Sequence, residues 1–247
     1  MEDWQDRTKK LIGKEKQNKI QNTKIAIFGL GGVGGFVFEA LLRSGVKNLA
    51  IVDGDNISNS NLNRQIIASI DNVGNSKVKE FEKRAKSINK DVNIYALNKK
   101  ITENNLEEIL EDIEKNIGKL EYIIDAVDDL KVKIKNILIC QEKKIKCISS
   151  MGAGFKLDTR KIKDENIFKT KTCRLAKKIR AELKKFLKSE KNTKNLKEKD
   201  FKNIIAVYSE EDMIDIEDKK TVASMIFVPA SFGIRIAEIC IRDIIQI

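Results

Sequence analysis

Short apolar runs alternate with amphipathic stretches along the first 150 residues of this 247-residue chain. In the amphipathic stretches apolar residues return every three or four positions, which is typical of a helix with one buried face. The short apolar runs between them are typical of buried strands. We therefore predict strands over residues 24–28, 49–52, 92–97, 122–126 and 146–149, and helices over residues 33–44, 76–89, 102–117 and 131–141, with Thr102 as the cap of the third helix.

This alternation of strands and helices predicts an α/β fold of the Rossmann-like, doubly wound type, with a mostly parallel sheet. Ligands of such folds bind at the carboxyl ends of the strands. Beyond residue 151 the pattern changes to a basic helical extension. There we expect an amphipathic helix over residues 173–187, a strand over 204–208 and an apolar helix over 227–245, with Pro229 tolerated in its first turn.

Five glycines fall within residues 29–35, between the first predicted strand and the first predicted helix. Gly29, Gly31 and Gly34 form a GxGxxG pattern, where a helix N-terminus can meet phosphate groups with free N–H groups. Asp53 ends the second strand 19 residues after Gly34, where a carboxylate could accept hydrogen bonds from a ribose. A dinucleotide dehydrogenase would show the same features. At this point redox chemistry and nucleotide-dependent activation are equally favoured.

Further polar residues favour activation. Arg64 can clamp a phosphate with two hydrogen bonds, and Lys77 can act as a point charge on the same ligand. Asn61 lies beside them in the sequence, and Asp128 just past a strand end could hold Mg²⁺ against phosphates. A hydride-transfer domain has no need for this set. Together with the glycine turn, it indicates a site that grips ATP so that the α-phosphate faces an attacking carboxylate.

Composition limits the remaining chemistry. The chain contains no histidine, so the commonest general base is absent. Its four cysteines form no CxxC pair, and we predict neither a zinc site nor a disulfide framework. No apolar run approaches the roughly 20 residues that a bilayer demands, and the chain opens without a secretory signal. We therefore expect a cytoplasmic protein that does not associate with membranes.

The net charge of +11 is concentrated in one segment. Residues 156–202 contain eighteen lysines and arginines against seven acidic residues, while the rest of the chain contains thirty of each sign. A lysine-rich proteome would spread the excess evenly. The concentration is typical of a surface that binds a polyanion, and it favours nucleic acid.

The patterns GxGGxG, DxD, NxxRQ, GxxK and DxxD over residues 20–150 resemble the adenylating domain shared by ubiquitin-activating enzymes and the ThiF and MoeB proteins. The resemblance implies that Arg64, Lys77 and Asp128 are catalytic, with Asp128 on Mg²⁺. It also implies a homodimer in which Arg7 enters the ATP site of the partner subunit. The further ATP-binding residues that it implies are Gly29, Gly31, Gly32, Gly34, Asp53, Asn61 and Gln65.

The second half resembles the tRNA threonylcarbamoyladenosine dehydratase branch of that family, through "ISSMGAGFKLD", "FKTKTCRLAKKIRAELKK", "VYSEE" and "SMIFVPASFGIRIAE". This branch implies ATP-dependent adenylation of a threonyl carboxylate at tRNA position 37, followed by ring closure with loss of water. It implies tRNA and a sulfur-relay or cysteine desulfurase protein as partners. The substrate-binding candidates are Gly152, Gly154, Lys156, Lys177, Lys178, Arg180 and Tyr208.

On this interpretation residues 1–23 form an N-terminal helical segment and residues 24–150 the ATP-binding adenylation domain. Residues 151–247 form a tRNA-binding segment that packs in the same fold unit. The nearest alternative is adenylation of the C-terminal glycine of a sulfur-carrier protein. A second alternative is a nucleotide-responsive binding module without catalysis. For Lys156, Arg180 and Tyr208 an ordinary surface role is equally favoured, and Cys173 is more simply a cap or packing residue than a thiolate.

Overall fold

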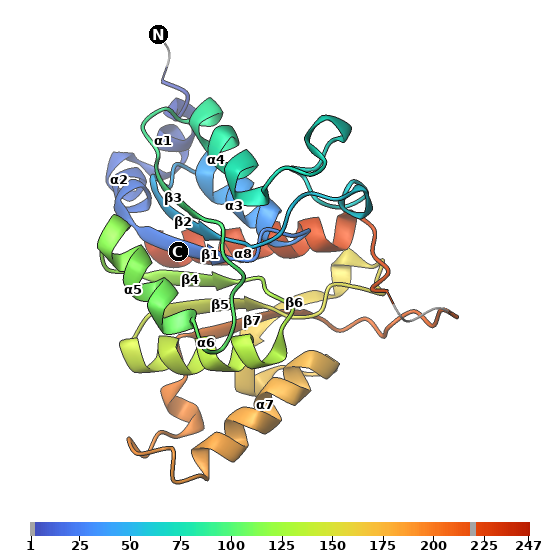
Figure 1. The fold of residues 1–247 in the computed structure, drawn as a ribbon. Helices are drawn as coiled ribbons and strands as arrows, with labels where there is room; N and C mark the ends of the chain where they lie inside the picture. The colour runs from blue at the N-terminus through green and yellow to red at the C-terminus, as the bar shows by residue number, and fades with distance from the viewer. Residues whose placement is uncertain (1–2, 218–220) are drawn as a thin grey trace.

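A single seven-stranded sheet runs through the protein (Figure 1). The computed structural model describes residues 3–217 and 221–247. Within them the strand order is β3-β2-β1-β4-β5-β7-β6, and all neighbours pair in parallel except β6, which is antiparallel to β7. The strands are β1 Lys24–Phe28, β2 Asn48–Val52, β3 Asn93–Leu97, β4 Tyr122–Asp125, β5 Lys146–Ser150, β6 Ile162–Asn166 and β7 Ile204–Ser209.

Helices cover both faces of the sheet, as Figure 1 shows. Ile25 and Ile27 of β1 pack with α3, α4 and α8 on one face, whereas Ala26 and Phe28 pack with α5, α6 and α7 on the other. This alternation follows from the two-residue period of a strand. The helices are α1 Asp6–Ile12, α2 Lys14–Asn22, α3 Gly34–Arg43, α4 Lys77–Ile88, α5 Leu106–Ile117, α6 Leu130–Lys143, α7 Arg174–Leu187 and α8 Phe227–Ile245.

The predicted α/β fold with a mostly parallel sheet is therefore confirmed, and two local predictions need correction. Helix α5 begins at Leu106 rather than at residue 102, because the side chains of Thr102 and Asn105 each accept a hydrogen bond from the other's backbone N–H group. These bonds close a separate turn before the helix. Strand β6 was not predicted, because its sequence IKDEN contains one apolar residue and it pairs along one side only, at the edge of the sheet.

The strand order alone indicates where a ligand crevice lies. The chain leaves β1 toward β2 and later returns to β4 on the other side of β1. The loops after β1 and β4 therefore diverge at the carboxyl ends of these strands, which is where open α/β sheets bind their ligands. None of the helices within the described residues is long and apolar enough to cross a membrane.

Candidate nucleotide and substrate cleft

A cleft of about 1050 Å³ opens at the carboxyl ends of β1, β2, β4 and β5. Its volume slightly exceeds the usual range for ligand pockets, about 300–1,000 Å³. Most of the predicted nucleotide and substrate residues meet in its wall, although they come from distant parts of the sequence. They are Gly29, Gly31, Gly32, Asp53, Asn61, Arg64, Gln65, Lys77, Asp128, Gly152 and Gly154.

The glycines of the turn after β1 have different steric roles. Gly29 adopts a φ of +85°, and a Cβ atom there would lie 2.8 Å from the carbonyl oxygen of Ala126. A Cβ on Gly34 would lie 1.8 Å from the carbonyl oxygen of Gly29, so Gly34 lets α3 pack against the turn. At Gly31 a Cβ would meet only the Gln65 amide, at 3.9 Å. Gly31 thus leaves open space in the cleft wall, whereas the predicted contact residue Gly34 does not line the cleft.

Asp53 links the glycine turn to the loop after β2. Its Oδ2 accepts the Leu30 N–H group at 2.7 Å, and its Oδ1 accepts the Asp55 N–H group at 2.8 Å. The buried Lys77 ammonium lies 2.9 Å from Asp55 Oδ2 and 3.8 Å from Asp53 Oδ1. A cation is therefore fixed beside the glycine turn, as a polyphosphate site requires.

The loop that follows carries the other predicted phosphate ligands. Asn61 is buried, and its Oδ1 accepts the Ser58 N–H group at 3.1 Å, so part of its role is to fold the loop. The half-buried Arg64 donates to the Ser60 carbonyl and to Asn63 Oδ1. Gln65 Oε1 is buried without a hydrogen-bond partner among the described residues. Such an acceptor favours a ligand or a water molecule that donates a hydrogen bond.

Asp128 lies exposed in the loop between β4 and α6, and it lines the cleft. The neighbouring Asp129 is occupied, because it caps α6 by accepting the N–H groups of Lys131 and Val132. Within residues 3–217 and 221–247, no three His, Cys, Asp or Glu side chains gather to hold a metal. Magnesium needs no such cage, since it binds one or two carboxylates together with phosphate oxygens and water. Asp128 fits that requirement.

At its other end the cleft reaches the basic part of the chain. Gly152 and Gly154 line it together with Leu175 in the first turn of α7. The segment around Val222 covers Gly154 closely, since a Cβ there would lie 2.3 Å from Val222 Cγ1. The Phe155 N–H group donates to the Ala223 carbonyl at 2.8 Å and fixes this contact.

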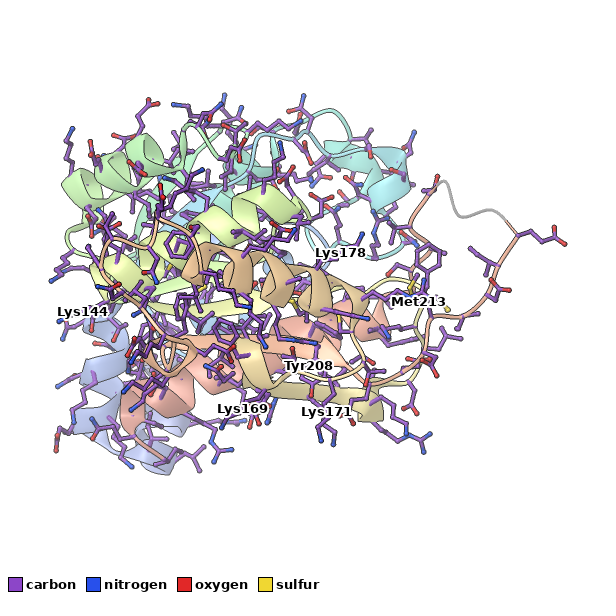
Figure 2. All side chains as sticks on the ribbon, turned by 90° about the horizontal axis from the view of Figure 1, so that it is seen from below. Lys144, Lys169, Lys171, Lys178, Tyr208 and Met213 are labelled. Atoms are coloured by element: carbon purple, nitrogen blue, oxygen red, sulfur yellow. The ribbon has the colours of Figure 1, made fainter. Side chains whose placement is uncertain are left out.

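The other predicted tRNA contacts lie outside the cleft wall and fall into two groups. Lys177 and Lys178 are exposed on α7, and Figure 2 shows Lys178 in the N-terminal half of that helix. In contrast, Lys156 is buried with its ammonium on the Glu211 carbonyl, and Arg180 is half-buried and donates to Thr170. Tyr208 is 3% exposed, and burial raises the pKa of its phenol.

Arg7 is exposed on α1 and does not line the cleft of its own chain. The four cysteines are all free and buried. Cys173 precedes the first residue of α7 and makes no side-chain capping bond there. The neighbouring Cys140 and burial raise the pKa of the Cys147 thiol well above its ordinary value.

One buried charged group behind the cleft is not among the predictions from the sequence pattern. Lys133 and Asp125 form an ion pair with 3.1 Å between Nζ and Oδ1, and Ser149 donates to the same carboxylate at 2.7 Å. A signal was available, because Lys133 shares the buried face of α6 with Ile137 and Cys140. A lysine at an inward position of a helix indicates a buried partner.

Comparison with known proteins identifies a family and several named relatives. The sequence profile of the ThiF family matches residues 5–234. A Bacillus subtilis protein named tRNA threonylcarbamoyladenosine dehydratase is 38% identical over 174 residues, which are 70% of this chain and 66% of that relative. The Escherichia coli protein of the same name is 30% identical over 225 residues, which are 90% of this chain and 80% of that relative.

Solved structures match over almost the whole chain. The crystal structure of E. coli tRNA N6-threonylcarbamoyladenosine dehydratase, TcdA, in complex with ATP superposes with a TM-score of 0.84 at 27% identity. The match covers 97% of this chain and 93% of that chain, and a complex of the same protein with AMP matches equally well. The similarity therefore includes the basic second half as well as the glycine turn.

Proposed function

Because this chain belongs to the ThiF family, we propose that it is an ATP-dependent tRNA threonylcarbamoyladenosine dehydratase. One observation carries the proposal. The cleft that gathers the glycine turn, Lys77, Arg64 and Asp128 continues without interruption to Gly152, Gly154 and the first turn of the basic helix α7. A nucleotide at one end can thus meet a substrate delivered from the basic end.

The reaction has two steps. A carboxylate oxygen of the threonyl group attacks the α-phosphorus of ATP, a new P–O bond forms, and pyrophosphate leaves. The carbamoyl group then attacks the activated carbonyl carbon, AMP leaves, and a ring closes with net loss of water. Both reacting groups of the second step belong to the same modified nucleotide, so proximity needs no enzyme nucleophile. This is compatible with a chain that has no histidine.

The residues of the cleft act mainly through charge and position. The backbone around Gly31 and Gly32 leaves room for the phosphates, and Arg64 and Lys77 stabilise the negative charge that develops at the α-phosphorus. Asp53 accepts hydrogen bonds from the ribose, and Asn61 and Gln65 complete the nucleotide contacts. When bound, Mg²⁺ on Asp128 would neutralise phosphate charge. Gly152 and Gly154 admit the modified base.

The cationic surface that we propose for tRNA is the N-terminal half of α7. Within the described part of the chain Lys177 and Lys178 form no ion pair, whereas Lys184 pairs with Glu198 at 3.3 Å and Lys185 with Glu182 at 2.6 Å. Unpaired charge is thus concentrated next to the cleft. Arg180 and Tyr208, which are half-buried and buried respectively, lie beneath this surface, whereas Lys156 is buried against the Glu211 carbonyl.

We further propose that two copies of the chain associate through the start of α8. Ile226, Phe227 and Ile234 are exposed large apolar side chains there, and their burial would stabilise a dimer. In such a dimer Arg7 of each subunit is the candidate for the ATP site of the other. Because the proposed substrate is tRNA, we expect the protein in the cytoplasm. A sulfur-relay or cysteine desulfurase protein is a further expected partner, and copurification tests it.

The decisive experiment uses the purified chain with ATP, Mg²⁺ and tRNA that carries threonylcarbamoyladenosine. We expect AMP to accumulate in step with a modified nucleoside that has lost the mass of one water. Asp128→Ala serves as the inactive control, since it removes the proposed metal ligand but leaves the tRNA surface intact. AMP that forms only with a sulfur-carrier protein, without any change in nucleoside mass, would contradict the proposal and favour carrier activation.

A further inference from the structure

A closed network of buried polar groups lies behind the cleft. The side chains of Asp125 and Lys133 are 0% and 1% exposed, and Ser149 is also fully buried. The Lys133 ammonium donates to Asp125 Oδ1 at 3.1 Å, to the Asp125 carbonyl at 3.4 Å and to Ser149 Oγ at 3.3 Å. The Ser149 hydroxyl donates to Asp125 Oδ2 at 2.7 Å. Every donor of the lysine therefore has an acceptor.

The network joins β4, β5 and α6, and the loops that follow β4 and β5 line the cleft. Asp125 is the last residue of β4, Ser149 is its register partner near the end of β5, and Lys133 lies in the first turn of α6. The loop from β4 to α6 carries Asp128, and the loop after β5 carries Gly152. Both loops line the cleft, so the network determines how these two loops lie relative to each other.

The same network also supports the glycine turn. Asp125 Oδ1 accepts the Val127 N–H group at 3.3 Å, which fixes the start of the loop. The Ala126 N–H group donates to the Phe28 carbonyl at 2.8 Å, and the Ala126 carbonyl oxygen lies 2.8 Å from the position that a Cβ on Gly29 would take. A shift of the loop would therefore disturb both Asp128 and the turn.

Stability alone does not account for this arrangement. Taking two charges out of water costs free energy, and well-packed apolar residues in place of a buried ion pair are often neutral or stabilising. Such a pair does, however, hold its partners in one geometry, because a displaced buried charge loses its compensation. The ion pair lies directly behind the loop that carries the proposed metal ligand, so a change in the geometry of the pair would move that ligand.

We propose that Lys133, held by Asp125 and Ser149, is a positioning residue that fixes the loop of residues 126–129 so that Asp128 faces the phosphates of ATP with its metal ion. Lys133 acts through this loop and does not contact the nucleotide. The inference rests on the proposed function for the identity of the second substrate, but not for the binding of ATP.

The double variant Asp125→Asn with Lys133→Met tests the proposal, because it removes both charges and nearly preserves the volume. ATP affinity is measured by calorimetry with Mg²⁺ and with a chelator, in the absence of tRNA. We expect the gain in affinity that Mg²⁺ provides to fall about 10- to 100-fold, as for other supporting residues of metal sites. Affinity without metal and the affinity for tRNA should change little, and kcat should fall while KM for tRNA stays the same.

Glu39→Gln is the matched control, since it weakens a different buried ion cluster, formed by α3 with Arg84, away from the cleft wall. Glu39→Gln should lower the melting temperature but keep the gain in ATP affinity that Mg²⁺ provides. If the double variant melts cooperatively and Mg²⁺ raises its ATP affinity as much as in the wild type, Lys133 is not a positioning residue. Should the double variant fail to fold, Ser149→Ala makes the same test with one hydrogen bond removed. Because this readout contains no tRNA, a wild-type chain that binds Mg·ATP but dehydrates no tRNA overturns the proposed function alone.

Discussion

At the scale of single residues, the glycines of the turn after β1 have two different roles, since some are required for packing and one leaves space for a nucleotide. Gly29 and Gly34 are required by the backbone itself, because a Cβ atom at either position would collide with a carbonyl oxygen. Gly31 has no such neighbour and faces the open cleft. The pattern GxGxxG therefore contains residues with different roles, and substitution can tell them apart.

Gly31→Ala should keep the melting temperature of the wild type but weaken ATP binding at least about tenfold, which corresponds to ~1.4 kcal/mol. Its methyl group would occupy the space that we assign to phosphate. Gly34→Ala should instead destabilise the fold by about 1–3 kcal/mol, because the added methyl overpacks the contact between α3 and the turn. Thermal melts and ATP titrations of the two variants check this. Equal loss of stability in both would contradict the separation of roles.

The ion cluster around Glu39 provides a pH-dependent prediction. Burial raises the pKa of Glu39, but hydrogen bonds from Arg84 and Arg43 outweigh it, so the pKa lies below its ordinary value of 4.5. A carboxyl group with a lowered pKa in the folded state contributes stability above its unfolded pKa, and this contribution is lost as the pH falls through the folded pKa.

Glu39→Gln should therefore lower the free energy of unfolding by about 2 kcal/mol at pH 7, the scale of hydrogen bonds to a charged group. The difference between wild type and variant should shrink as the pH falls below 4.5, the ordinary pKa of a glutamate side chain. Urea unfolding of both proteins from about pH 7 to about pH 3 measures it, a range that spans the ordinary pKa. A difference that stays constant over this range would show that the charge of Glu39 contributes nothing.

At the scale of elements, α7 divides into two halves with similar composition and different electrostatics. Both halves carry adjacent lysines, Lys177 with Lys178 and Lys184 with Lys185. The second pair is compensated by Glu198 and Glu182. Because the first turn of the helix lines the cleft, the uncompensated pair lies nearer to the proposed substrate. The charge run seen in the sequence is thus not uniform on the surface.

Lys177→Gln with Lys178→Gln should weaken tRNA binding and reduce the slope of log K against log salt concentration by about 0.7–0.9 for each phosphate that is no longer neutralised. Lys184→Gln with Lys185→Gln removes the same charge from the same helix and should change the slope much less. Filter binding at several salt concentrations distinguishes the two double variants. Equal effects would assign tRNA binding to general charge rather than to the N-terminal half of α7.

At the scale of the whole molecule, the proposed dimer rests on two features, the exposed apolar residues of α8 and the position of Arg7 outside the cleft wall of its own chain. Phe227 is 48% exposed and Ile234 is also exposed, although the opposite face of α8 is buried in the core. Arg7 lies on α1, outside the cleft wall of its own chain. A dimer would explain both features if each subunit contributes Arg7 to its partner.

Mixing two inactive variants tests this contribution. Arg7→Ala and Asp128→Ala subunits, unfolded and refolded together, should regain about a quarter of wild-type activity, because half of the dimers are mixed and one of their two sites is complete. Each variant alone should stay inactive. If the mixture remains inactive while exchange of subunits is verified, Arg7 does not act in the partner's site.

Local patterns were enough to predict most elements and the position of the glycine turn. The bounds of α8 agree with the prediction, and those of α3 and α4 differ by one residue at each end. Such patterns reflect contacts between residues close in the sequence, where the period of a helix or strand decides which side chains are buried. Elements without this signal were misjudged, namely the polar edge strand β6 and the start of α5, where side-chain hydrogen bonds compete with the helix.

Local sequence patterns are sufficient for the fold class, the family resemblance and the kinds of side chains available for the chemistry. Tertiary structure alone decided which of them meet, because the order of the strands brings together loops that are far apart in the sequence. In the folded chain Asp128 lines the same cleft as the glycine turn, and Lys156 and Tyr208 are buried. Lys133 is buried in an ion pair with Asp125. Burial and ion pairing depend on these long-range neighbours, which no local period contains.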